Sequence, residues 1–404
     1  MRLLYFTSED INSGLFNNQV YENILGLIEL KPDMEVTLAV INRPWKWLGH
    51  KTKIEEMRSK NIKVVYLPFS PPMRYYTSSI GLNKLYIMFF SLVFKLFVNS
   101  KQYDLIHCRH YLPSLVCQFL GLKNILFDVR SLSLFEYVEA GKIKQNSKIY
   151  DYWLNQEEDL INYVDGISVV SKSMIKYFEQ YSPRYIAHCP IIVSTENVYY
   201  SEDQRSRHRG AWGWTNNNVY VYSGSFGLYG LNKAYLAKLI SLIVSSDSKA
   251  KFLFLLSNSE SEFNSFVLDF EFDKQVFKYF SVGSDDLFKY LSASDVGIHS
   301  LPPQIDSFTR LGTKVVEYWC CGLPTLLNSN VGEAADISRT HGFGHVVELD
   351  ESVDTKDLVL DYSKFSREEI RAKASVLFDK KVVLRDYLKA YDMIISSPRE
   401  ECYE

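Results

Sequence analysis

Short apolar segments with the composition of buried β-strands alternate with segments of helical periodicity along most of the chain. Because a strand followed by a helix must cross over before the next strand begins, this alternation predicts parallel sheets covered by helices on both faces. The strand-like segments are MRLLYFTS, EVTLAVIN, IKVVYLP, DLIHCR, NILFDVRS and DGISVVS in the first half, and NVYVYSGS, KFLFLLS, VFKYFSVG, DVGIHSLP, TLLNS and HVVELD in the second. The sequence therefore predicts an α/β protein.

The alternation is interrupted by the polar and turn-rich residues 196–218. A chain of 404 residues is too long for one hydrophobic core, so we interpret this interruption as the domain linker plus a helical approach segment. The prediction is two doubly wound, Rossmann-like domains facing across a cleft, with ligands at the carboxyl ends of the strands. The predicted parts are a first domain of residues 1–198 completed by a C-terminal helix at about 385–404, a linker of residues 199–218 and a second domain of residues 219–384.

Acidic and basic residues are nearly balanced, because 45 Lys and Arg against 48 Asp and Glu give a formal net charge of −3. Such a chain has no general attraction for a nucleic-acid backbone, so no nucleic acid is expected as a partner and any phosphate must be bound locally. The six cysteines lack C-x-x-C spacing, and the adjacent Cys320 and Cys321 lie in an apolar run. We therefore expect buried free thiols, a reducing compartment and a cytoplasmic protein.

The most apolar helical segment covers residues 82–100. Lys84 and Lys95 interrupt it, whereas about 20 consecutive apolar residues are needed to cross a bilayer, so we expect no membrane span. The pattern favours a helix that faces the core of an α/β domain. The alternative is a helix that lies in the membrane surface, which would suit an enzyme whose acceptor carries a lipid.

The segment Ser307–Leu326 combines hydroxyl groups, two cations and one carboxylate with the start of an apolar strand. Lys314 and Glu317 are about one helical turn apart and share a face of the predicted helix. Charged groups beside apolar residues need partners. Either the two form an ordinary solvated pair, or they bind a polar ligand.

Seven stretches that follow the predicted strands carry a family resemblance when they are taken in order. They are GLFNNQV, YDLIHCRHYLPSL, FDVRSLSLFEYVEAGK, DGISVVSKSM, YSGSFGLYG, SVGSDDLFKYLSASDVGI and TKVVEYWCCGLPTL. In this arrangement the chain resembles the GT-B glycosyltransferases, and among them the retaining glycosyltransferase family four (group 1) of bacterial surface-polysaccharide biosynthesis.

The resemblance implies transfer of a hexosyl or related sugar, with retention, from a nucleotide-sugar to a hydroxyl of a glycan or polyprenyl-linked glycan acceptor. A UDP- or GDP-sugar is the expected donor, and O-antigen or capsule is the expected product. The leaving diphosphate would act as the base, so the protein would contribute positioning and charge stabilisation. A lipid-linked acceptor would bring the protein to the cytoplasmic face of the inner membrane.

For the second domain, the resemblance implies that Glu317 accepts hydrogen bonds from the donor ribose. Lys314 and Arg310 would neutralise the diphosphate, and backbone amides would cradle the phosphates. Lys314 and Glu317 are thus the catalytic candidates of this domain. The other donor-binding candidates in it are Gly224, Ser225, Val282, Thr309 and Thr313.

For the first domain, Gly14 would allow close approach of the backbone to a phosphate or sugar. Arg130 stands where many relatives have a histidine that contacts the donor sugar, which makes it a third catalytic candidate. Asp128 and Arg109 are candidates for binding the sugar or the acceptor. The alternative is a structural Asp–Arg pair that steadies a loop. His107 and His110 are expected to be structural.

Three departures from the family pattern leave other functions open. Thr309 stands where relatives have a glutamate, and Ser225 and Gly230 stand where they have Arg and Lys. A GT-B relative with another chemistry, such as a nucleotide-sugar epimerase, and a non-catalytic partner subunit are therefore the alternatives. The sequence has no D-x-D flanked by apolar strand residues, so neither a metal nor another cofactor is expected.

Overall fold

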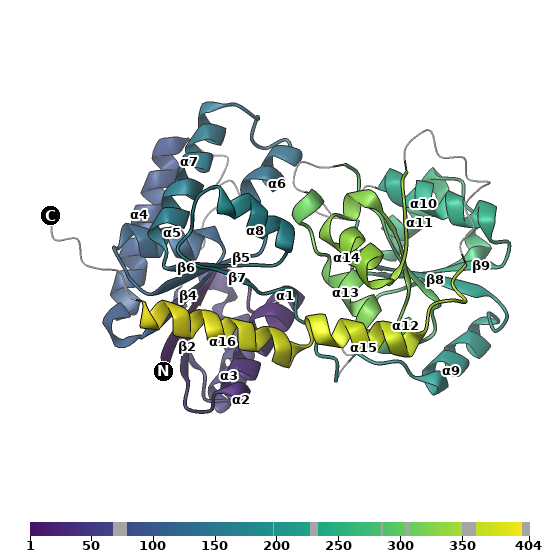
Figure 1. Ribbon diagram of the computed structural model, residues 1–404, viewed down its shortest axis with the longest axis horizontal. Coiled ribbons are helices and arrows are strands. Elements are labelled where there is room, and N and C mark those ends of the chain that lie inside the picture. The colour runs from purple at the N-terminus through teal and green to yellow at the C-terminus, as the bar shows by residue number, and fades with distance from the viewer. Residues whose placement is uncertain are drawn as a thin grey trace. The chain divides into compact units, whose positions relative to one another are not determined.

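The computed structural model describes residues 1–67, 79–196, 198–226, 233–283, 286–303, 307–349 and 361–397. The chain forms two compact units (Figure 1). Unit 1 consists of Met1–Pro190 and Lys380–Glu404, and unit 2 consists of Ile191–Asp379. Each unit is built on one parallel sheet with helices, so the predicted α/β class is confirmed.

Unit 1 contains a seven-stranded sheet with the order β3-β2-β1-β4-β5-β6-β7. Its central strands are buried almost throughout, which is why they read as continuous apolar runs in the sequence. The strands are β1 (Arg2–Thr7), β2 (Glu35–Ile41), β3 (Lys63–Leu67), β4 (Leu105–Arg109), β5 (Ile125–Val129), β6 (Gly166–Val169) and β7 (Ile186–His188).

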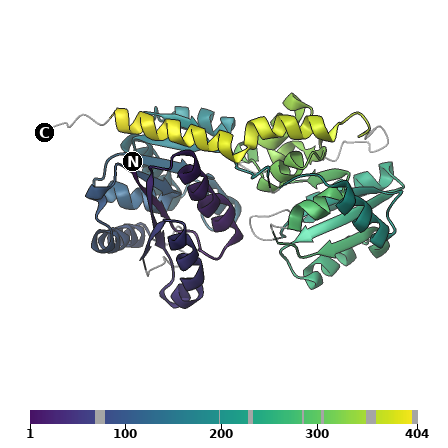
Figure 2. The ribbon, with the colours of Figure 1, turned by 90° about the horizontal axis from the view of Figure 1, so that it is seen from below.

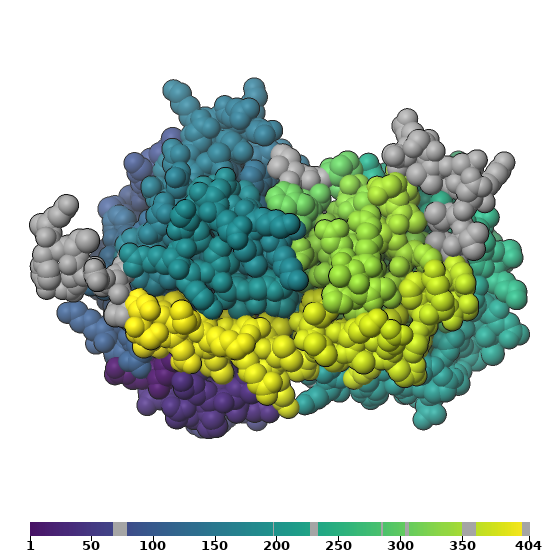
Figure 3. Space-filling view, in the orientation of Figure 1, coloured from purple at the N-terminus to yellow at the C-terminus, as the bar shows by residue number. Residues whose placement is uncertain are grey.

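Helices connect these strands, and the last helix of the described chain completes unit 1. The helices are α1 (Gly14–Phe16), α2 (Glu22–Leu30), α3 (Trp47–Ser59), α4 (Ile80–Phe97), α5 (Tyr111–Phe119), α6 (Ser133–Glu139), α7 (Lys148–Tyr163), α8 (Lys172–Glu179) and α16 (Lys380–Ser396). Helix α16 packs against α2 at Gly26, where a Cβ atom would lie only 2.3 Å from the Leu384 side chain. Figures 2 and 3 show α16 in yellow along the surface of unit 1.

Unit 2 contains a six-stranded parallel sheet with the order β10-β9-β8-β11-β12-β13. Numbered within each unit, the first six strands of both sheets have the Rossmann order 3-2-1-4-5-6. The strands are β8 (Asn218–Gly224), β9 (Ala250–Leu256), β10 (Phe277–Phe280), β11 (Val296–His299), β12 (Thr325–Asn328) and β13 (Gly344–Val347). The helices are α9 (Glu202–Trp212), α10 (Lys233–Ser246), α11 (Glu260–Asp269), α12 (Leu287–Ser292), α13 (Thr313–Cys320), α14 (Glu333–His341) and α15 (Arg367–Phe378).

The boundary between the units differs from the predicted linker of residues 199–218. Those residues contain α9, which packs on α12 as part of unit 2. Arg205 and Arg209 of α9 form ion pairs with Asp295, and Arg209 also donates to the carbonyl of Ala293 at 2.8 Å. The segment has no sustained apolar period because arginines make many of its contacts, together with Trp212, which stacks on Phe280. This is why the segment was assigned to the linker.

The chain passes from unit 1 to unit 2 after Pro190 and returns after Asp379. Within unit 2, the segments next to these two positions are hydrogen-bonded to each other. Val193 forms a parallel bridge with Asp379, and its N–H donates to the carbonyl of Phe378 at 3.1 Å. The hydroxyl of Thr195 also donates to the Asp379 carboxylate. The return to unit 1 therefore occurs at Lys380, five residues before the predicted start of the C-terminal helix.

The sequence interpretation found no segment long enough to cross a membrane, and this judgement of length is corrected by α4 (Ile80–Phe97). Helix α4 is long and apolar enough to do so, although such a helix also occurs in the core of soluble proteins. One third of α4 is buried. Its buried residues include Ile87, Phe90 and Phe94, which pack into the core of unit 1. The expectation of buried free thiols is confirmed for the described cysteines: Cys108, Cys117, Cys189, Cys320 and Cys321. Cys402 lies outside the described residues.

Candidate functional site

Within each unit, the polar residues selected from the sequence gather at the edge where the parallel strands end. The neighbouring strands whose connections leave in opposite directions are β1 and β4 in unit 1, and β8 and β11 in unit 2. Ligands of Rossmann-type sheets bind at such switch points. We call these two places the unit 1 edge and the unit 2 edge.

Asp128, the fourth residue of β5, is the centre of the unit 1 edge and is fully buried. Its Oδ1 accepts hydrogen bonds from the hydroxyls of Ser168 and Tyr387, each at 2.9 Å. Its Oδ2 lies 3.3 Å from Nη1 of Arg109 and 3.5 Å from Nε2 of His107. Burial alone would raise the pKa of Asp128, but the nearby positive groups hold it well below its usual value.

Arg130 is engaged on several sides at the same edge, and its side chain is only 7% exposed. Its Nη1 donates to the Tyr387 hydroxyl at 3.0 Å, and its Nη2 donates to Oε1 of Gln19 at 3.1 Å. Arg109 is also buried, and its Nη1 donates to the backbone carbonyl of Gln19 at 3.3 Å. The structure thus brings Asp128, Arg109 and Arg130 together. The two arginines form ion pairs with Asp128, so these charges neutralise one another.

The sequence interpretation missed two features of the unit 1 edge, the charge partners of Glu9 and the backbone conformation of His110. Glu9 follows β1 and lies 3.3 Å from Nε2 of His110 and 3.6 Å from Nε of Arg109. Burial opposes ionisation of Glu9, but these two neighbours lower its pKa to about 2. His110 has φ 69° and ψ 176°, a conformation that is essentially restricted to glycine. The sequence interpretation of His110 as merely structural did not anticipate this backbone.

Gly14 opens the short helix α1, which is capped by the hydroxyl of Ser13. A Cβ atom at Gly14 would meet no heavy atom within 4 Å. Packing in unit 1 therefore does not require a glycine here, and the space beside it is open. The predicted approach of a phosphate or sugar to Gly14 stays a prediction.

Helix α13 carries the main candidates of the unit 2 edge. Its buried side is formed by Val315, Val316 and Trp319, and the hydroxyl of Tyr318 accepts a 2.6 Å hydrogen bond from the N–H of Ser223 at the end of β8. Gly297 on β11 makes this packing possible, because a Cβ there would lie 2.3 Å from the Tyr318 ring. The helix is thereby fixed against the strands that flank the switch point.

Lys314 and Glu317 form an ion pair on the other side of α13, with 2.9 Å between Nζ and Oε2. The Glu317 side chain is 9% exposed and that of Lys314 is 37% exposed. The carboxylate is therefore nearly buried, while the ammonium group still reaches solvent. Thr313 is the first residue of this helix, and no side chain of the described residues caps its start. The N-terminus of α13 thus has the backbone donors that commonly bind anions.

Thr309 and Arg310 lie immediately before α13, and Thr309 is buried in the short helix Ser307–Thr309. This helix packs tightly on the start of α14, because a Cβ at Gly332 would lie 1.7 Å from the Ser307 carbonyl oxygen. Gly332 has φ 67°, so both its conformation and its surroundings require glycine.

The other donor-binding candidates follow neighbouring strands of unit 2. Gly224 ends β8, and a Cβ there would lie 2.7 Å from the Tyr222 hydroxyl oxygen. Ser225 is the next residue, and Val282 follows β10, where it packs against the cluster that contains Tyr318. Gly230 lies outside the described residues.

His299, the last residue of β11, is a residue of the unit 2 edge that the sequence interpretation did not select. Its ring stacks on that of Tyr222 with 6.0 Å between centroids, and its buried Nδ1 has no hydrogen-bond partner among the described residues. Burial, assisted by the charge of Arg310, lowers the pKa of His299 to about 4. Its position at the carboxyl end of a strand beside the switch point was the signal that could have found it.

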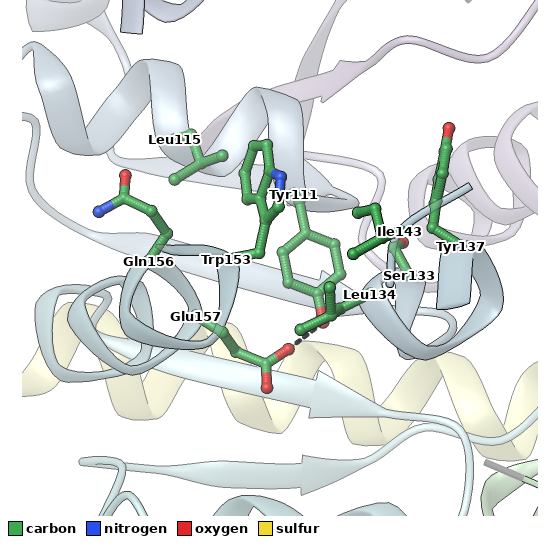
Figure 4. Close-up of a pocket in the computed structure, with 9 residues that line it drawn as sticks. All are labelled: Tyr111, Leu115, Ser133, Leu134, Tyr137, Ile143, Trp153, Gln156 and Glu157. Atoms are coloured by element: carbon green, nitrogen blue, oxygen red, sulfur yellow. Dashed lines mark hydrogen bonds between the residues drawn. The ribbon is translucent and has the colours of Figure 1, made fainter. Parts of the chain in front are cut away.

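Two cavities lie away from these edges. In unit 1, a cavity of about 10 Å³ lies between α5, α6 and α7, and Figure 4 shows the hydroxyl of Tyr111 pointing to the buried carboxyl of Glu157. Burial raises the pKa of Glu157, and the space holds about one water molecule. In unit 2, a cavity of about 540 Å³ is lined by Asn218 and Val296, which begin strands, so it lies at the opposite edge of the sheet.

No family model and no curated protein matches the sequence. Solved structures with a similar fold include sucrose-phosphate synthase from Thermosynechococcus elongatus, with a TM-score of 0.69 and 13% identity over 98% of this chain and 100% of that one. HepE from Anabaena in complex with UDP has a TM-score of 0.65 and 14% identity over 97% and 100% of the two chains. WaaG, a glycosyltransferase involved in lipopolysaccharide biosynthesis, has a TM-score of 0.58 and 13% identity over 98% and 100%.

At these identities the likeness establishes the fold, and it extends over nearly the whole chain. The predicted GT-B fold is thereby confirmed. Membership of glycosyltransferase family four and a role in surface polysaccharides stay predictions.

Proposed function

We propose that this protein is a glycosyltransferase that moves a sugar from a nucleotide-sugar donor to a hydroxyl of a glycan or lipid-linked glycan. The observation that carries the proposal is the nearly buried Glu317 beside the exposed end of Lys314, at the switch point of a Rossmann sheet. The GT-B fold supports it, because HepE has this fold and was solved with UDP and with UDP-glucose.

In this proposal Glu317 accepts hydrogen bonds from the two ribose hydroxyls of the donor. Lys314 turns from Glu317 toward the diphosphate, and Arg310 and the free start of α13 add positive potential. The bond between the anomeric carbon and the diphosphate breaks as the acceptor oxygen bonds to the same face of that carbon. The acceptor proton passes to the departing phosphate oxygen. Stabilising the negative charge on the leaving group is then the main contribution of unit 2.

The charged group of the unit 1 edge has a positioning role in the proposal. Arg130 and Asp128 are buried and paired, so they are suited to holding the loops after β1, β4 and β5. Gly14 opens α1 after β1, His110 precedes α5 after β4, and both have more open surroundings. Retention at the anomeric carbon, independence of a metal, a cytoplasmic site of action and a role in O-antigen or capsule synthesis complete the proposal on the strength of the sequence resemblance.

The test is a thermal-shift screen of the purified protein against nucleoside diphosphates and nucleotide-sugars in EDTA. A ligand that binds only the folded state raises the melting temperature, so the expected result is a shift with one nucleotide. The same nucleotide should not shift Glu317→Ala. Glu369→Ala is the matched control, because it breaks the exposed pair of Glu369 with Lys373 elsewhere in unit 2 and should respond like the wild type.

A wild type that no nucleotide shifts would contradict the proposal and favour a non-catalytic partner subunit. The second candidate is an epimerase of the same fold. It is favoured because Thr309 and Ser225 stand where the family has charged residues. An epimerase would convert the nucleotide-sugar without an acceptor and release no nucleoside diphosphate. Analysis of the products by nuclear magnetic resonance separates these two reactions.

A further inference from the structure

Helix α4 exposes a continuous row of large apolar side chains on the side away from the core of unit 1. They lie one, three or four residues apart along the helix and are 40% to 73% exposed. This α4 apolar face consists of Leu82, Leu85, Met88, Phe89, Leu92 and Leu96. Single exposed leucines are ordinary, but a contiguous apolar face that runs along a whole helix indicates a binding surface.

The opposite side of α4 fixes how the helix can meet a partner. Ile87, Phe90, Val93 and Phe94 are buried in the core of unit 1, and α4 packs on α5. The helix therefore lies along the surface of unit 1 over its length of about 27 Å. In this position α4 presents one long face to a partner and does not cross a bilayer. Figure 1 shows α4 on the left of unit 1.

The charges on α4 all have the same sign. Lys84 and Lys95 are both exposed, about three helical turns apart, and so lie on the same side at the border of the α4 apolar face. The helix contains no Asp or Glu, although the whole chain has a formal net charge of −3. An apolar strip bordered by lysines complements an anionic lipid surface, because the aliphatic stems can lie among lipids while the ammonium groups reach the headgroups.

We propose that the α4 apolar face binds the surface of an anionic lipid bilayer, with the helix axis parallel to that surface. The leucines, Met88 and Phe89 enter the boundary of the acyl chains, and Lys84 and Lys95 contact anionic headgroups. A second copy of the chain is a poorer match, because it would offer the same lysine-bordered face, whereas an anionic surface complements both the apolar strip and the lysines. The proposal does not depend on the transferase chemistry.

The test is co-sedimentation of the full-length protein with vesicles of phosphatidylcholine, alone or mixed with phosphatidylglycerol. We expect binding to the mixed vesicles, weaker binding to phosphatidylcholine alone, and a decrease with added salt. Leu85→Glu/Leu92→Glu should lower the bound fraction at least tenfold. Lys84→Gln/Lys95→Gln should remove the preference for phosphatidylglycerol. Each lysine should contribute about fivefold to the affinity for the mixed vesicles.

The matched control is Leu268→Glu/Val376→Glu, which places two glutamates at exposed apolar positions of unit 2. It should bind vesicles like the wild type. Circular dichroism and melting temperature show that each variant is folded, and an unchanged nucleotide shift shows that a loss of lipid binding is separate from the donor site.

Three results would overturn the proposal. The first is a wild type that stays in the supernatant with both kinds of vesicle. The second is an equal bound fraction for the wild type and Leu85→Glu/Leu92→Glu. The third is a wild-type dimer in light scattering that Leu85→Glu/Leu92→Glu converts to a monomer without any vesicle binding, because the α4 apolar face would then be an interface between copies.

Discussion

The two strand-end edges have the same Rossmann topology but use their charged groups in opposite ways. At the unit 1 edge, Asp128 is fully buried and is surrounded by arginine, histidine and tyrosine side chains. At the unit 2 edge, Glu317 has Lys314 as its ion-pair partner, and the end of Lys314 reaches solvent. The same topology therefore produces a rigid, internally neutralised edge in one unit and an edge with charge available for a ligand in the other.

The difference has an energetic basis. Removing one member of a buried charged group leaves the others uncompensated in a medium of low dielectric constant, which costs about 3–5 kcal/mol. Breaking a partly exposed pair on a helix costs about 0.3–0.5 kcal/mol. The unit 1 edge should therefore be sensitive to substitution through stability, and the unit 2 edge through ligand binding.

The largest effect is expected from Asp128→Asn. It leaves Arg109 and Arg130 buried without their carboxylate, so the free energy of unfolding of unit 1 should fall by about 3–5 kcal/mol. Chemical denaturation, monitored by hydrogen exchange of amides in unit 1, measures the change in the free energy of unfolding. Asp386→Asn is the control, because its pair with Lys389 is exposed and should contribute less than about 1 kcal/mol. Equal effects of the two substitutions would remove the distinction between the edges.

Acid should destabilise the two units in different pH ranges. His299 has a pKa lowered to about 4, so the unfolded state binds the proton first and unit 2 loses stability as the pH falls from about 6.5 to 4. Glu9 has a pKa lowered from 4.5 to about 2, so its contribution to unit 1 is present above pH 4.5 and is lost as the pH falls toward 2. Each change amounts to about 3 kcal/mol.

Hydrogen exchange at a series of pH values reports on the two units separately. His299→Asn should flatten the upper range in unit 2, and Glu9→Gln should flatten the lower range in unit 1. If either variant keeps the wild-type pH dependence, the corresponding side chain is not responsible for it.

A smaller effect is expected at His110, where the backbone conformation favours glycine. His110→Gly and His110→Ala both remove the contact with Glu9, but only glycine relieves the strain. The glycine variant should therefore be more stable than the alanine variant by about 1 kcal/mol. Paired denaturation curves measure this difference, and an alanine variant that is equally stable would exclude backbone strain at His110.

The smallest effect on stability is expected from Glu317→Gln, which should change the free energy of unfolding by about 0.5 kcal/mol or less. Its affinity for the nucleotide found in the thermal-shift screen should fall about tenfold or more, because hydrogen bonds to a charged group contribute about 1.5–3 kcal/mol each. Calorimetric titration compares the variant with the wild type. A large loss of stability with unchanged affinity would assign Glu317 to the structure of α13.

The strands and most helices were predictable because apolar periodicity is a local property of the sequence. Strands such as β2 and β9 are buried on both faces and stand out as uninterrupted apolar runs. Helix α9 was expected only as a helical part of the linker, because its packing depends on arginines and on Trp212 near its end rather than on a repeated apolar pattern. The outward face of α4 was equally hidden, since composition does not show which side of an apolar helix packs on the core.

The candidate site was predictable where it depends on one segment of the chain. Lys314 and Glu317 are three residues apart, and the sequence alone places them on one face of a helix. The unit 1 edge depends on residues far apart: Tyr387 reaches Asp128 across 259 positions of the sequence. The Nδ1 of His299, which has no hydrogen-bond partner in the described part of the chain, depends on burial, which a single sequence does not display.

The division of unit 1 into two pieces of sequence has a consequence for synthesis of the chain. Residues 1–190 leave the ribosome before unit 2 does, but Tyr387 and Tyr391, which bond to Asp128 and His107, emerge only after unit 2. Unit 2 is one continuous segment and is complete as soon as Asp379 has emerged. Because domains fold as units, we expect unit 2 to reach its final structure before the older half of the nascent chain does.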